Sequence, residues 1–110
     1  MTTRFCFTLD LVDNPEKIAE YEQHHENVWP EVRQSFEDAG ILSMELYRWE
    51  TRLFMIMDVD DTFSFERKAE IDRSNPVVQS WESLMSSYQV RLANSPEEGK
   101  WLLMKNIFGT

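Results

Sequence analysis

Three side chains that could bind and protonate a small polar ligand recur every four residues: Tyr21, His25 and Trp29. Residues at i, i+4 and i+8 lie along one face of an α-helix, so a helix here would line up a phenol, an imidazole and an indole. Histidine has an ordinary pKa that lets it give and take a proton near neutrality. The set suits a polyhydroxylated ligand, with His25 as proton carrier, Tyr21 as hydroxyl partner and Trp29 as an apolar plate.

A structural role for these residues is the more common outcome in proteins. A lone histidine is often hydrogen-bonded within the fold, and aromatic residues at helical spacing often belong to a core. The adjacent His24 would point about 100° away from His25 on an ideal helix. We therefore expect His24 to be solvated and His25 to carry any chemistry.

The elements that would position these residues can be read from caps and hydrophobic periods. Residues 4–12 alternate and predict a strand. Asn14-Pro15 is typical of a helix start, and Trp29-Pro30 should split or kink the helix that follows. Gly40 should end it as a left-handed cap.

The second half of the chain predicts two strands, a further interrupted helix and a last strand. These segments are residues 41–49 and 52–59 as strands, 62–73 and 77–88 as helices, a loop at 94–99, and 101–108 as a strand. The order βαββαβ is the ferredoxin-like arrangement, an α+β fold with the helices on one sheet face. The bare face would be covered if two copies met face to face, as a homodimer forming a dimeric α+β barrel.

Two further positions are candidates for binding. Trp81 falls in an apolar helical stripe, where core packing is the simpler interpretation, but its ring could also pack against a sugar. Glu82 beside it is either surface charge or a hydrogen-bond acceptor at a pocket rim. Tyr47 shares a strand face with Trp49, two residues away.

Composition excludes several classes of protein. The chain has 110 residues, one domain by length (1–110), and a formal net charge of −9. This charge disfavours nucleic acid and anionic membrane surfaces as partners. The single Cys6 cannot form an internal disulfide, and neither a signal peptide nor a membrane span is recognisable, so we expect a cytoplasmic protein.

No motif for a metal or a cofactor stands out. The chain lacks a glycine-rich phosphate loop, a CxxC pair and an HExxH helix. The acidic cluster at 58–61 lacks the glycine and distal glutamate of a calcium loop, so we interpret it as a turn and helix cap. We therefore expect neither a cofactor nor a metal.

The pattern Tyr21-x-x-x-His25-x-x-Val28-Trp29-Pro30-Glu31, followed by the Tyr47 strand and Val77-x-x-x-Trp81, resembles the L-rhamnose mutarotase family. The resemblance spans nearly the whole chain. It implies a dimeric ferredoxin-like α+β fold and interconversion of the α and β anomers of 6-deoxy-L-sugars. It further implies that His25 transfers the proton, while Tyr21 and Trp81 bind the sugar.

Two features of the sequence bear on which sugar is the substrate. Glu82 replaces the second of two adjacent tryptophans in the rhamnose enzyme, and the tail 98–108 looks more like relatives associated with L-fucose. The resemblance thus favours L-fucose, with L-rhamnose next. Two other interpretations remain: a similar barrel acting as an oxygenase or binding module for an apolar aromatic molecule, and an interaction protein whose sheet only dimerises.

Overall fold

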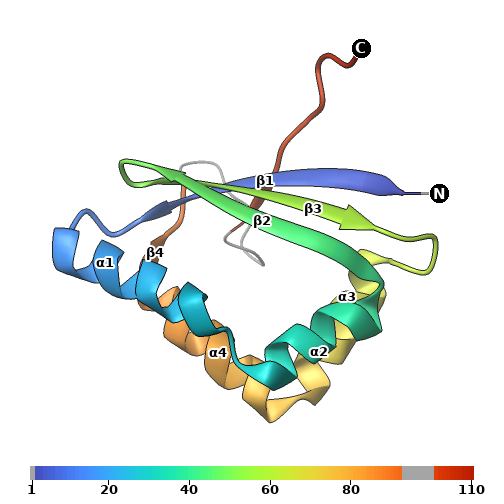
Figure 1. Ribbon diagram of the computed structural model, residues 1–110, viewed down its shortest axis with the longest axis horizontal. Helices are drawn as coiled ribbons and strands as arrows, with labels where there is room; N and C mark the ends of the chain where they lie inside the picture. Colours follow the sequence, from blue (N-terminus) through green and yellow to red (C-terminus); the bar gives the residue numbers. More distant parts are fainter. Residues whose placement is uncertain (1, 93–100) are drawn as a thin grey trace.

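The computed structural model describes residues 2–92 and 101–110, which form an antiparallel sheet with helices packed on one side (Figure 1). The elements follow the chain as β1 (Thr3–Leu11), α1 (Pro15–His24), a short 3₁₀ helix η1 (His25–Asn27), α2 (Pro30–Ala39), β2 (Ile41–Trp49), β3 (Arg52–Val59), α3 (Phe65–Ser74), α4 (Pro76–Ser86), β4 (Gln89–Val90) and β5 (Leu102–Leu103).

The strand order is β2-β3-β1-β4, and β5 also pairs with β1. Every pairing is antiparallel. The predicted α+β order, with the helical segments on one face, is confirmed. Among the described residues no helix is long and apolar enough to cross a membrane.

Local chemistry sets the helix boundaries near the cavity described below. The Asn14 side chain accepts from the backbone N–H groups of Glu16 and Lys17, which caps α1. Pro30 begins α2, where the N–H that proline lacks would have had no partner within the helix. Gly40 ends α2 at φ +89°, and a Cβ at this position would lie 2.5 Å from a carboxylate oxygen of Asp60. The left-handed backbone conformation therefore favours glycine here, and any larger residue would also have to displace the Asp60 side chain.

One irregularity in β2 decides which side chains face the helices. The register with β3 shifts between Ile41 and Ser43, so the alternation advances by one residue. Beyond this bulge Met44 and Leu46 point toward the helices, where Leu46 packs against the core. Tyr47 and Trp49 consequently lie on the opposite face.

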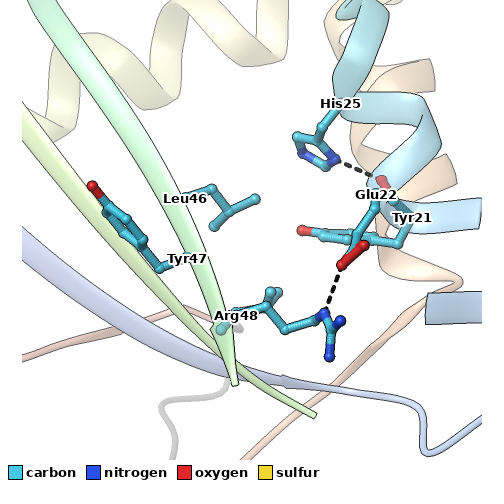
Figure 2. A pocket seen from close by; sticks show the side chains of 7 residues that line it. Tyr21, Glu22, His25, Leu46, Tyr47 and Arg48 are labelled. Carbon is cyan, nitrogen blue, oxygen red and sulfur yellow. Dashed lines mark hydrogen bonds and ion pairs between the residues drawn. The ribbon is translucent and has the colours of Figure 1, made fainter. Parts of the chain in front are cut away.

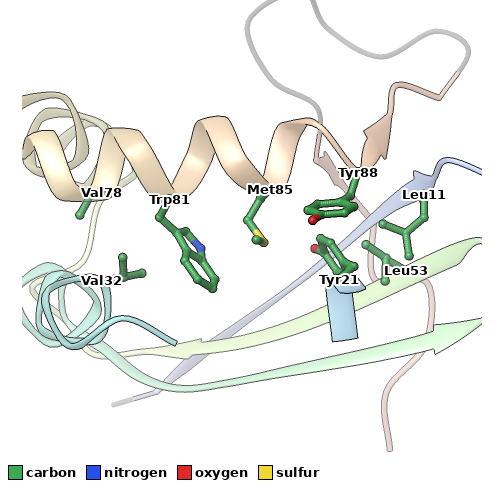
Figure 3. Close-up of a cluster of buried hydrophobic side chains, with 8 residues drawn as sticks. All are labelled: Leu11, Tyr21, Val32, Leu53, Val78, Trp81, Met85 and Tyr88. Atoms are coloured by element: carbon green, nitrogen blue, oxygen red, sulfur yellow. The ribbon is translucent and has the colours of Figure 1, made fainter. Parts of the chain in front are cut away.

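The core lies between the sheet and the helices in two clusters. The larger one joins α1, α4 and the middle of the sheet, and its buried members are shown in Figure 3: Leu11, Tyr21, Val32, Leu53, Val78, Trp81, Met85 and Tyr88. The second cluster lies under the other end of the sheet and comprises Phe7, Ala39, Ile41, Met57 and Val59.

Two predictions about the C-terminal half are wrong. Residues 101–108 do not form one strand; only Leu102–Leu103 pair with β1, and Asn106 instead accepts the N–H of Phe108 through its side chain. The last helix ends at Ser86, and the next residues turn so that Gln89–Val90 pair with β1. The loop predicted at 94–99 lies outside the described residues.

The second sheet face carries no described helix (Figure 1). Cross-strand rows on it include Tyr47 opposite Phe54 and Glu45 opposite Ile56. Tyr47 and Trp49 are 53% and 77% exposed. The tail leaves the sheet on this side, with Ile107 and Phe108 exposed. This face therefore combines exposed aromatic side chains with the Arg4–Asp58 and Arg52–Asp10 ion pairs.

Candidate active site

A cavity of about 350 Å³ opens between α1 and the β2–β3 hairpin, and Figure 2 shows the side chains around it. Its lining residues are Tyr21, Glu22, His25, Leu46, Tyr47, Arg48 and Leu53. The lining combines two leucine side chains with the phenols of two tyrosines, an imidazole, a carboxylate and a guanidinium. A cavity of this kind fits a small ligand with several hydroxyl groups.

His25 lies just past the last turn of α1, as the first residue of η1. Its Nδ1 is 2.8 Å from the carbonyl oxygen of Tyr21. A carbonyl can only accept, so Nδ1 carries the proton and neutral His25 keeps its lone pair on Nε2. Partial burial lowers the pKa of His25, and the charge of His24 lowers it further, against the opposing effect of the bond to Tyr21. The imidazole is therefore neutral at pH 7 and able to accept a proton.

Tyr21 contributes both its backbone and its side chain. Its ring packs 4.6 Å from the His25 ring between centroids. Its hydroxyl accepts a hydrogen bond of 3.2 Å from the Gln89 side-chain amide. Burial is the main cause of the raised pKa of Tyr21, so the phenol remains protonated and can donate to a ligand.

Trp29 and Trp81 were predicted to pack against the ligand. In the structure they pack behind His25 and are not among the residues that line the cavity. Trp81 is 7% exposed and meets the His25 ring edge-on at 5.6 Å. Trp29 lies at the N-terminal boundary of α2 and packs edge-on against Trp81 at 5.2 Å. The three residues predicted on one helical face therefore do not all touch. Tyr21 contacts His25 directly, whereas Trp29 contacts Trp81, which in turn contacts His25.

Glu22 and Arg48 are the charged lining residues that were not predicted from the sequence. Arg48 Nε donates to a Glu22 carboxylate oxygen at 2.7 Å, joining α1 to β2 across the cavity (Figure 2). Strand alternation places Arg48 on the same face as the partly buried Leu46. Arg48 could have been identified from the sequence, because it is a charged residue at a strand position that faces the helices.

The other two predicted binding residues have different surroundings. Tyr47 lines the cavity edge, but its ring points away from His25 (Figure 2). Glu82 is exposed and is not among the residues that line this cavity. Desolvation, followed by the charge of Asp72 on α3, raises its pKa, whereas Lys68 opposes the effect.

His24 is not the solvated residue that we expected. It is half-buried, and its Nε2 lies 3.2 Å from the Tyr88 hydroxyl, which in turn donates to Glu20 at 2.9 Å. Tyr88 follows α4 and reaches this side of α1, which helical geometry within α1 could not reveal. Across the described part of the chain, no group of three or more His, Cys, Asp or Glu side chains could hold a metal ion.

The fold and the cavity together define a small α+β protein in which a neutral, partly buried histidine faces a cavity with several polar groups in its wall, a site able to move protons on an uncharged ligand. A sequence profile described as L-rhamnose mutarotase matches residues 4–110. The chain belongs to the L-rhamnose mutarotase family, whose members are carbohydrate isomerases.

Individual relatives agree with this assignment. An L-fucose mutarotase from Xanthomonas campestris pv. campestris is 40% identical over 107 residues, covering 96% of this chain and 86% of the relative. An L-rhamnose mutarotase from Phocaeicola vulgatus is 30% identical and covers 84% and 86% of the two chains. The structure of L-rhamnose mutarotase FA22100 from Formosa agariphila has a TM-score of 0.70 at 20% identity, covering 98% of both chains, and confirms the predicted fold.

Proposed function

We propose that this protein interconverts the α and β anomers of a 6-deoxy-L-hexose, with His25 as the proton-transferring residue. The observation that carries the proposal is the 2.8 Å contact between His25 Nδ1 and the Tyr21 carbonyl oxygen. It holds the imidazole in the tautomer whose Nε2 accepts a proton. The phenol, the imidazole and the charged groups of Glu22 and Arg48 in the cavity wall favour a sugar over an aromatic polyketide, which needs few hydrogen-bonding partners.

Mutarotation opens the pyranose ring and recloses it on the other carbonyl face. In the opening step Nε2 of His25 takes the proton from the anomeric hydroxyl, the C1–O5 bond breaks, and the ring oxygen gains a proton from water. Rotation about C1–C2 turns the aldehyde, and the same transfers in reverse close the ring. Tyr21 donates a hydrogen bond that orients a sugar oxygen. Positioned proton transfer contributes about 10²–10⁴-fold in rate.

L-Fucose is the favoured substrate, with L-rhamnose second. The preference is supported by the 40% identical L-fucose mutarotase. By the resemblance, Glu82 replaces a second tryptophan of the rhamnose enzyme, although it lies outside the cavity that contains His25. Glu82→Trp should shift the preference toward L-rhamnose if Glu82 reaches the substrate. We propose Trp29 and Trp81 as supports of the binding site and Tyr47 as a contact at its edge.

The test is anomer exchange measured by saturation-transfer NMR on equilibrated L-fucose and, separately, L-rhamnose. The protein should accelerate exchange, and His25→Ala should remove about 10²-fold or more of that acceleration. Added imidazole should restore part of the lost rate, which a folding defect would prevent. Gln23→Ala, at an exposed position on α1, serves as the control. A His25→Ala rate close to that of the parent protein would remove His25 from the mechanism.

We also infer a homodimer in which the bare sheet faces meet, and a cytoplasmic location. The exposed aromatic groups of β2 and the apolar tail support the dimer, because a second copy of the chain would cover them. Light scattering after chromatography should give twice the chain mass. Trp49→Lys should shift that mass toward the monomer; an unchanged mass would place the interface elsewhere.

A further inference from the structure

The ion pair between Glu22 and Arg48 lies at the boundary of two cavities. Both residues line the cavity that contains His25 and also a second cavity of about 310 Å³. The second cavity is completed by Asp13, Pro15, Ile18, Ala19, Glu50 and Thr51. A ligand held beside His25 would therefore meet this ion pair at the end where the cavity continues toward the β2–β3 turn.

The guanidinium of Arg48 is held in a fixed orientation by two bonds. Nε donates to Glu22 at 2.7 Å, and Nη1 donates to the carbonyl oxygen of Glu50 at 2.7 Å. Glu50 occupies the turn with φ +53°, which brings its carbonyl back toward the strand that precedes it. Among the described residues no hydrogen bond engages Arg48 Nη2 or the second carboxylate oxygen of Glu22.

Stability does not explain this arrangement. The two side chains are 34% and 53% exposed, and an ion pair this accessible to water contributes little to folding. What the pair does supply is a rigid donor next to a rigid acceptor at the cavity wall. Two adjacent hydroxyl groups of a sugar need such a combination, because one can accept from a guanidinium while the other donates to a carboxylate.

We propose that Glu22 and Arg48 recognise a pair of neighbouring ring hydroxyls and thereby determine which 6-deoxy-L-hexose binds. The proposal rests on the mutarotase function proposed above and adds a specificity-determining pair to it. Arg48 Nη2 donates to one hydroxyl and the second oxygen of Glu22 accepts from its neighbour. Sugars that differ in the configuration of those hydroxyls cannot satisfy both groups at once, and leaving either group unpaired weakens binding.

Anomer exchange measured as a function of sugar concentration separates binding from chemistry. Arg48→Met should raise KM for L-fucose about tenfold or more, the expected effect of losing a charge-assisted hydrogen bond, while kcat changes by less than about threefold. It should also narrow the difference in kcat/KM between L-fucose and L-rhamnose. Arg33→Met removes an exposed arginine of α2 outside both cavities and should leave KM unchanged. An unaltered KM in Arg48→Met would overturn the proposal.

The charge-swapped double variant, Glu22→Arg with Arg48→Glu, separates recognition from folding. It can re-form the ion pair but exchanges the positions of donor and acceptor. Its thermal stability should match the parent protein, while its KM should remain raised. Recovery of the parent KM and sugar preference would show that the pair only joins α1 to β2.

Binding measured by NMR titration of each sugar keeps this proposal separate from the proposed function. The parent protein could bind a sugar without accelerating anomer exchange, and Arg48→Met could weaken that binding. This result would contradict the proposed function but support Glu22 and Arg48 as the recognition pair. Absence of binding by the parent protein to either sugar would overturn both.

Discussion

Two histidines one residue apart, at the end of α1, have opposite surroundings. His25 binds a backbone carbonyl, packs against Tyr21 and Trp81, and faces a cavity. His24 turns to the other side and contacts the hydroxyl of Tyr88. The carbonyl dictates a single tautomer for His25, whereas the hydroxyl can donate or accept and leaves that of His24 open. The partner of an imidazole, more than its place in the sequence, decides which chemistry it can perform.

The largest effect is expected from removing the wall behind His25. Trp81→Ala deletes a nearly fully buried indole that contacts His25 and Trp29, and should lower the free energy of unfolding by about 3–5 kcal/mol. Urea denaturation measures the loss. Trp81→Phe keeps an aromatic ring in place and should cost clearly less. Equal losses for the two variants would contradict a role for ring contact in holding His25.

A smaller effect should appear in the dependence of stability on pH. The folded-state pKa of His25 is lowered, so between it and the ordinary value near 6.5 the unfolded chain binds more protons. His25 therefore leaves stability unchanged above about pH 7 and reduces it as the pH falls through 6.5. The raised pKa of Glu82 acts in the opposite direction. The difference between the parent protein and His25→Gln in urea denaturation isolates the histidine, and it should grow toward acid pH.

The smallest effect should reveal the influence of His24 on His25. The charge of His24 lowers the pKa of His25, so His24→Gln should raise it. Because neutral His25 is the base, the acid limb of the rate–pH profile should move to higher pH, with little change in the rate on the plateau. Anomer exchange measured across the acid range reports both quantities. A limb that stays in place would contradict an influence of the His24 charge on His25.

Most elements that frame the site could be predicted from the sequence because their signals are local. Asn14, Pro30 and Gly40 each mark a boundary by their own backbone chemistry, and the structure confirms all three. The pairing of Tyr21 with His25 also follows from spacing alone, since one helical turn separates them.

Contacts between distant segments could not be predicted in this way. Glu22 meets Arg48 only because the β2–β3 hairpin folds back over α1, and His24 meets Tyr88 only because α4 ends beside it. The C-terminal segment alternates like a strand, yet only its first residues pair with β1. The N–H of Met104 still donates to the carbonyl oxygen of Cys6, but beyond it the side chain of Asn106 accepts the backbone N–H of Phe108.

The bulge in β2 has a consequence for insertions and deletions in the gene. If Leu42 were deleted, Ser43 would follow Ile41 directly and would keep Asp58 as its partner, so the ladder with β3 would continue without the bulge. Leu46 and Arg48 would still face the helices, and Tyr47 and Trp49 would still face the bare side. Deletion of a residue beyond the bulge, such as Glu45, would instead exchange the faces of the side chains that follow it, and Arg48 would leave the cavity. The strand should therefore tolerate the loss of a residue at Leu42 better than at positions between Met44 and Arg48.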